Sequence, residues 1–219
     1  MTDPAPLAAE RGRVAAAARR LAADGLVAGT SGNVSERDGD RVAITPTGAV
    51  LAELDAADVA VVDLDGNQVG GKLEPTSELD LHLGVYDRYG AGGVVHAHAP
   101  MATALSTVLD EVPCVHYEML LLGGTIPVAP YRTFGTPELA ETVLDALEGH
   151  TACLMANHGT IAFGSGVDKA VELTALVEWS CTVYWRARAL GEPRALDEKE
   201  RAAVVEAAVA RNYGRTRPA

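Results

Sequence analysis

Two histidines, His96 and His98, stand one residue apart at the end of an apolar run over residues 92–99. Alternate residues of a β-strand point to the same face, so both imidazoles can address one point in space. Neutral imidazole is a common ligand of divalent transition metals. The pair therefore predicts part of a metal site, although two such histidines can also be ordinary hydrogen-bonded groups near a surface.

Two further side chains could complete this site. His158 stands in a predicted turn between two apolar runs, where Gly159 permits close backbone approach. Glu78 falls in the first turn of a predicted helix, and three histidines with one carboxylate satisfy a tetrahedral zinc ion. His82, four residues later on the same helical face, could compete as a ligand, but we favour a supporting or packing role.

A second group of candidates is polar and uncharged. Residues 29–33, 45–48 and 75–77 supply hydroxyls, glycines and an amide in three loops, and the last loop opens the helix that carries Glu78. Such groups, together with the backbone N–H groups of a helix N-terminus, can hold a phosphate without a cluster of basic side chains. Each loop alone is typical of an ordinary turn, so the phosphate hypothesis requires that the three loops converge.

The elements that must position these residues predict a mixed fold. Helices are expected over residues 11–23, from Ser77 onward, and over residues 101–109, 136–149, 168–190 and 197–212. Strands with short turns are expected around residues 38–40, around residues 65–67, before Pro100, and over residues 151–164. We expect one α/β domain of the three-layer α+β type over residues 1–219, with a mainly antiparallel sheet covered by helices. The apolar stretch 119–128 suits either core or interface.

Composition excludes several classes of function. The formal net charge of -12, with 18 basic against 30 acidic residues, argues against a broad nucleic-acid or anionic-membrane surface. No run approaches the roughly 20 apolar residues that span a bilayer, and the first residues lack a signal-peptide pattern, so a cytoplasmic protein is expected. Three scattered cysteines, Cys114, Cys153 and Cys181, indicate neither a disulfide framework nor a cysteine-based zinc site.

The order and spacing of several short motifs resemble the class II aldolase/adducin family, most closely its L-fuculose-1-phosphate aldolase branch. The motifs span nearly the whole chain: Gly29-Thr30-Ser31-Gly32-Asn33, Thr45-Pro46-Thr47-Gly48, Thr76-Ser77-Glu78, His96-Ala97-His98, His116-Tyr117, Phe134-Gly135-Thr136, Asn157-His158-Gly159 and Tyr213-Gly214. Two departures concern the third motif. Thr76 stands where the family commonly has a serine, and Glu74 is an additional residue in the loop before it.

The resemblance implies the role of each site residue. It implies one zinc ion per subunit held by His96, His98, His158 and a displaceable Glu78; cobalt, manganese and iron also suit this ligand set. It implies that the substrate phosphate is bound by Asn33, Thr47, Gly48, Thr76 and Ser77. It further implies a homotetramer with active sites at subunit interfaces, where Tyr117 and Tyr213 act at the site of a neighbouring subunit.

The activity implied is that of an aldehyde-lyase acting on a small-molecule sugar phosphate. A metal-dependent aldolase would cleave a ketose 1-phosphate such as L-fuculose 1-phosphate into dihydroxyacetone phosphate and a small aldehyde, with Glu78 as the base. The alternatives are an L-ribulose-5-phosphate 4-epimerase or another sugar-phosphate lyase of the same fold, and an adducin-like module without activity. The glutamate at position 78, where the epimerase branch often has aspartate, favours the aldolase, and the complete ligand set counts against the inactive module.

Overall fold

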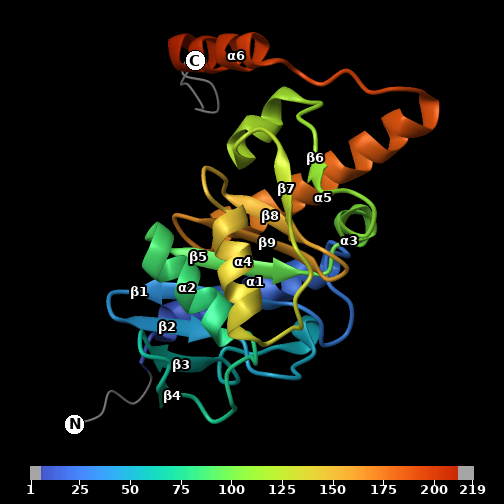
Figure 1. Cartoon of the computed structure of the whole chain (residues 1–219). Helices are drawn as coiled ribbons and strands as arrows, with labels where there is room; N and C mark the ends of the chain where they lie inside the picture. The colour runs from blue at the N-terminus through green and yellow to red at the C-terminus, as the bar shows by residue number, and fades with distance from the viewer. Residues whose placement is uncertain (1–5, 212–219) are drawn as a thin grey trace.

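The computed structural model describes residues 6–211, which are built around one nine-stranded sheet (Figure 1). The strands lie in the order β4-β3-β2-β1-β5-β9-β8-β7-β6. Every neighbouring pair is antiparallel except β7 and β8, so the expected mainly antiparallel sheet is confirmed. The strand bounds are β1 Asn33–Asp38, β2 Arg41–Ile44, β3 Ala60–Asp63, β4 Gln68–Gly70, β5 Gly93–Ala97, β6 Glu111–Val112, β7 Ile126–Ala129, β8 Ala152–Met155 and β9 Gly159–Gly164.

Helices cover both faces of the sheet, as expected for three layers. One face packs against α1 (Ala8–Ala23), α3 (Pro100–Ser106) and α5 (Val167–Leu190), and the other against α2 (Leu79–Tyr89) and α4 (Pro137–Ala146). Strand β5 is buried along its whole length because it lies between these layers: Val95 and Ala97 join the first core, and Val94 joins the second. Because alternate residues of a strand share a face, His96 lies on the same face as Val94.

Local signals in the sequence account for two of the helix ends. Thr136 caps α4 by accepting the backbone N–H of Leu139 at 3.3 Å, and Pro137 occupies the first helical position. Helix α2 ends at Gly90, whose φ of 61° is the left-handed conformation that glycine adopts at low cost. No helix within residues 6–211 combines the length and hydropathy needed to cross a bilayer.

The C-terminal third of the sheet differs from the expectation. Strands β6 and β7 were not predicted, and the apolar stretch 119–128 is divided between the 3-10 helix η2 (Tyr117–Leu122) and β7. Met119, Leu122 and Ile126 are fully buried, so these three residues belong to the core. A second 3-10 helix, η1, spans Leu51–Glu53. Helix α6 (Glu198–Arg211) has no buried residue and lies apart from the sheet (Figure 1).

Candidate metal centre and active site

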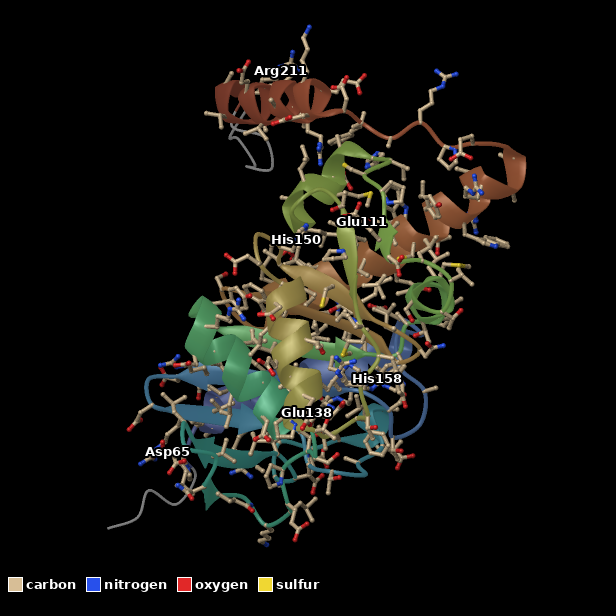
Figure 2. All side chains as sticks on the ribbon, viewed as in Figure 1. Asp65, Glu111, Glu138, His150, His158 and Arg211 are labelled. Carbon is tan, nitrogen blue, oxygen red and sulfur yellow. The ribbon has the colours of Figure 1, made fainter. Side chains whose placement is uncertain are left out.

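Sheet pairing brings the three candidate histidines together. His96 lies on β5 and His98 follows directly after its end, whereas His158 lies in the three-residue turn that joins β8 to β9. Strands β5 and β9 are neighbours, with Ala97 opposite Thr160, so this turn lies beside the end of β5. The possible ligand atoms of the three imidazoles lie within 4.8 Å of one another. In Figure 2 the label of His158 is well separated from that of His150.

The backbone at the β8–β9 turn explains how His158 reaches this position. Asn157 adopts φ 56°, a left-handed conformation that asparagine tolerates better than most residues. A Cβ atom on Gly159 would lie 2.4 Å from the carbonyl oxygen of Ala97 and 3.1 Å from the His98 ring. Only glycine therefore allows β9 to lie this close to β5, which confirms the close approach predicted for Gly159.

A hydrogen bond orients the His96 ring. Its Nδ1 lies 2.9 Å from the carbonyl oxygen of Thr160, which can only accept, so the Nδ1–H donates. In a neutral imidazole this leaves a lone pair on Nε2, which faces His98 Nε2 at 3.0 Å. Metal-binding histidines commonly donate their other N–H to a backbone carbonyl in this way.

Glu78 completes the cluster from the N-terminal end of α2. Its Oε2 lies 3.2 Å from His96 Nε2, and its Oε1 lies 3.5 Å from His158 Nε2. Asn33 donates its Nδ2–H to Oε2 at 2.9 Å, whereas the buried Oε1 has no hydrogen-bond partner among the described residues. A buried carboxylate oxygen without a donor is costly, so this atom is suited to a cation.

The protonation states of the cluster suit a metal ion. Burial raises the pKa of Glu78, but the nearby His96 and the hydrogen bond from Asn33 lower it, and the net pKa lies below the ordinary value. Burial, and then the neighbouring His96, lower the pKa of His98 and of His158 to about 4. At neutral pH the site therefore holds an anionic carboxylate and, at His98 and His158, neutral imidazoles, which are the forms that bind metals.

Three of the six ligand pairs also have a spacing that fits zinc, and the three imidazoles as a group lie within 4.8 Å of one another. A tetrahedral zinc ion with Zn–N bonds of about 2.0–2.1 Å requires ligand atoms about 3.3 Å apart. The contacts of 3.0, 3.2 and 3.5 Å between His96 and His98, His96 and Glu78, and Glu78 and His158 are close to this value. His82 is not part of the cluster, because its Nε2 bonds to the Asn33 side chain instead.

The three polar loops converge on this cluster. Thr47 donates its N–H to the carbonyl of Glu74 at 3.0 Å, and Thr76 donates its N–H to the carbonyl of Thr45 at 3.1 Å, so two of the loops are tied together. The additional residue Glu74 thus takes part in this pairing. A cavity of about 290 Å³ opens between the loops, lined by Thr30, Ser31, Gly32, Asn33, Pro46, Thr47, Gly48, Thr76, Ser77, Glu78, His98, Tyr131, Arg132, Phe134, Asn157 and His158. All five residues expected to bind phosphate line it.

The cavity wall also contains residues to which sequence reasoning assigned no role. Tyr131, Arg132 and Phe134 line the side contributed by the segment between β7 and α4. Two aromatic rings and a guanidinium in a short loop are a weak signal of a binding surface, and 59% of Tyr131 and 68% of Phe134 is exposed. Their position depends on the parallel pairing of β7 with β8, which was not predicted.

One expected site residue, Tyr117, lies elsewhere in the described chain. Tyr117 begins η2, is 40% exposed, and lines a separate, mainly apolar cavity of about 530 Å³ against α6 rather than the cavity at the histidines. Tyr213 lies outside the described residues. Among the other histidines, His116 accepts the N–H of Glu118 as the cap of η2, and His150 lies against the carbonyl of Glu148.

Comparison with known proteins agrees with this arrangement. The family described as Class II Aldolase and Adducin N-terminal domain matches residues 12–185. The chain belongs to this family. A 5-methylthioribulose-1-phosphate/5-deoxyribulose-1-phosphate aldolase of Rhodospirillum rubrum is 41% identical over 84% of this chain and 85% of the relative. The L-fuculose phosphate aldolase of Escherichia coli strain K12 is 40% identical over 83% of this chain and 86% of the relative.

A solved structure of a related protein also has the same fold as this chain. A protein titled L-fuculose 1-phosphate aldolase superposes with a TM-score of 0.87 at 33% identity, covering 91% of this chain and 95% of that protein. The central sheet with helices on both faces is thus the fold of this family.

Proposed function

We propose that this chain is a metal-dependent aldolase that cleaves a ketose 1-phosphate into dihydroxyacetone phosphate and a small aldehyde. The observation that carries the proposal is the convergence of three imidazoles and a buried carboxylate oxygen of Glu78 that has no hydrogen-bond donor among the described residues, at the wall of a polar cavity. A divalent cation bound there would stabilise the negative charge that develops on the ketose oxygens. The relatives that act on ketose 1-phosphates support this choice of reaction.

The loops around the cavity provide a place for the phosphate. Thr47 and Gly48 come from one loop, and Thr76 and Ser77 immediately precede α2, whose N-terminal end carries a partial positive charge. Hydroxyls and backbone N–H groups at such a helix end bind anions without a basic cluster. We assign these four residues and Asn33 to the substrate phosphate.

The proposed reaction requires two proton transfers. Cleavage breaks the C3–C4 bond of the ketose: the C4 hydroxyl loses its proton and becomes the aldehyde carbonyl, and the bonding electron pair stays with C3. A proton must then be delivered to C3 to give dihydroxyacetone phosphate. Glu78 lies beside the metal ligands and is ionised, because its pKa lies below the ordinary value. In the condensation direction it can take this proton from C3, and in the cleavage direction, once it has taken a proton from water, it returns that proton to C3.

The aldehyde half distinguishes the candidate substrates. L-Fuculose 1-phosphate, 5-deoxyribulose 1-phosphate and 5-methylthioribulose 1-phosphate share C1 to C3 and differ in the aldehyde that leaves. The first would release lactaldehyde, the second acetaldehyde, and the third a methylthio-substituted acetaldehyde. Tyr131 and Phe134 contribute exposed aromatic surface to the cavity wall, which suits an aldehyde with an apolar end.

The metal, the assembly and the compartment are further parts of the proposal. We assign zinc to the site, because three imidazoles and one carboxylate suit its tetrahedral preference. We propose a homotetramer in which Tyr117 and Tyr213 serve a neighbouring subunit, with Tyr117 handling the proton of the departing aldehyde; light scattering tests the assembly. Three buried free cysteines agree with a reducing compartment such as the cytoplasm.

A product assay tests the activity. The purified protein, loaded with zinc, is incubated with each of the three ketose 1-phosphates and with L-ribulose 5-phosphate, and dihydroxyacetone phosphate is measured. We expect zinc-dependent release from at least one ketose 1-phosphate. Epimerisation of L-ribulose 5-phosphate without release from any ketose 1-phosphate would replace the aldolase by the epimerase.

Replacement of the proposed base tests the role of Glu78. Glu78→Gln keeps the size of the side chain but removes its ability to accept a proton. We expect kcat to fall by roughly 10²- to 10⁴-fold, the usual contribution of a general base. Metal content is measured in the same preparation, so that loss of the base is separated from loss of the metal. Turnover equal to that of the unmodified chain, with metal bound, would refute this assignment.

A further inference from the structure

A continuous chain of polar side chains runs from Glu78 into the core between β1 and α2. Asn33 contacts Glu78 and His82, and Ser35 contacts His82 at 2.7 Å and Tyr86 at 2.6 Å. We call these five residues the β1–α2 polar chain. All five are buried, and the exposed fraction of His82 is 0%. Of the five, Glu78 contacts two histidines of the metal cluster, and Asn33 is the other member that lines the cavity. Ser35, His82 and Tyr86 do not line the cavity.

Matched periodicities explain how a strand and a helix build this chain. Glu78, His82 and Tyr86 are four residues apart, which is about 6 Å along a helix. Asn33 and Ser35 are two residues apart, which is about 6.6 Å along a strand and keeps both on one face. The two sets therefore interleave over their whole length.

The contacts also determine the direction of every hydrogen bond. The carboxylate of Glu78 can only accept, so Asn33 presents its NH₂ group to Glu78 and its carbonyl oxygen to His82. The carbonyl oxygen requires a donor, so the proton of His82 is on Nε2 and its Nδ1 accepts from Ser35. Ser35 then accepts from the Tyr86 hydroxyl. Each group has a partner and one consistent orientation.

The charge states agree with these directions. Burial, followed by the neighbouring His96, lowers the pKa of His82 to about 3, so its imidazole is neutral and carries one N–H. Burial raises the pKa of Tyr86 above its ordinary value, so its hydroxyl keeps the proton that it donates. No other described group donates to the Asn33 carbonyl oxygen, and rotation of the Asn33 amide would turn that oxygen toward the carboxylate of Glu78.

We infer that His82 is a positioning residue, whose Nε2–H locks the Asn33 amide so that its NH₂ group holds Glu78 Oε2 and leaves Oε1 free toward the metal cluster. The inference rests on the proposed function only for its effect on turnover. The hydrogen-bond order itself is a property of the folded chain.

Imidazole nitrogen NMR tests the hydrogen-bond order without an activity assay. In the full-length, zinc-loaded protein labelled with ¹⁵N-histidine, the six histidines give separate ring patterns, and His82→Gln identifies the one that belongs to residue 82. We expect a neutral Nε2–H form with a proton that is protected from exchange. An Nδ1–H form or an imidazolium at neutral pH would overturn the inference.

Three variants test the effect on Glu78. His82→Phe keeps a ring but removes both nitrogens, and His82→Gln retains an N–H that can reach Asn33. Val85→Ala removes buried methyl groups from the same helix and leaves the five polar side chains unchanged. We expect His82→Phe to lower kcat by roughly 10- to 100-fold, as for other residues that orient a metal ligand. We expect His82→Gln to restore most of the activity and Val85→Ala to retain it.

The two proposals fail in different ways. If His82→Phe and Val85→Ala have the same kcat per folded, zinc-loaded protein, or if His82→Gln is as impaired as His82→Phe, His82 only packs and the inference is wrong. If the unmodified chain releases no dihydroxyacetone phosphate but residue 82 shows the protected Nε2–H form, the proposed function fails and the positioning of Glu78 stands.

Discussion

Gly159→Ala is the substitution whose effect the structure determines most directly. The added Cβ atom would lie 2.4 Å from the Ala97 carbonyl oxygen, whereas ordinary C···O contacts begin at about 3.3 Å. The oxygen belongs to the central strand β5, which is paired on both sides, so it has no room to turn away. Strands β5 and β9 would therefore have to separate locally by about 0.9 Å.

This separation acts on both stability and metal binding. Overpacking a buried contact typically costs about 1–3 kcal/mol of the free energy of unfolding. His158 directly precedes Gly159 and would move with it, away from His96 and His98. Metal–ligand distances tolerate only about 0.2 Å, so we expect the zinc affinity to fall by at least 10-fold.

The assay combines urea denaturation with competitive zinc titration. Gly12→Ala is the matched control, because Gly12 lies within α1 and an added Cβ atom there would meet nothing within 4 Å. We expect the control to raise stability by roughly 0.5–1 kcal/mol, the helix preference of alanine over glycine, without a change in zinc affinity. If Gly159→Ala matches the unmodified chain in both the free energy of unfolding and the zinc affinity, the close contact between β5 and β9 does not determine the geometry of the metal site.

Three further predictions concern other parts of the molecule. Thr136→Ala removes the cap of α4 and should lower the free energy of urea unfolding by about 1 kcal/mol; an unchanged value contradicts the cap. Thr47→Val removes a proposed phosphate ligand and should weaken ketose 1-phosphate binding by roughly 10-fold, seen as a higher KM; an unchanged KM removes this residue from the phosphate site. His82, with its pKa at about 3, stays neutral in the folded chain but binds a proton when unfolded below about pH 6.5, so stability should fall with pH by up to roughly 1.4 kcal/mol per unit. Urea unfolding of the metal-free protein at pH 7 and pH 5 measures this loss, and His82→Gln should reduce it; an equal loss in the variant would exclude His82 as its source.

Several features were readable in the sequence because they depend on residues close together in the chain. The caps and spacing around Thr136 and Pro137 predict α4, and the single residue between His96 and His98 predicts that both imidazoles share one face. The four-residue spacing of Glu78 and His82 likewise places both on one side of α2. Backbone geometry alone enforces these relations, so they hold before any tertiary contact forms.

Other features depended on contacts between distant segments. His158 reaches His96 only because β9 pairs with β5, and Glu78 meets both only because α2 packs over β1. The strands β6 and β7, and with them the position of Arg132 in the cavity, follow from a parallel pairing of β7 with β8 that leaves no local pattern. Periodicity specifies which face of an element is buried, but the free energy of packing between elements decides which faces meet. The sequence thus determined which side chains were available for the site, and the pairing of distant strands decided which of them came within bonding distance.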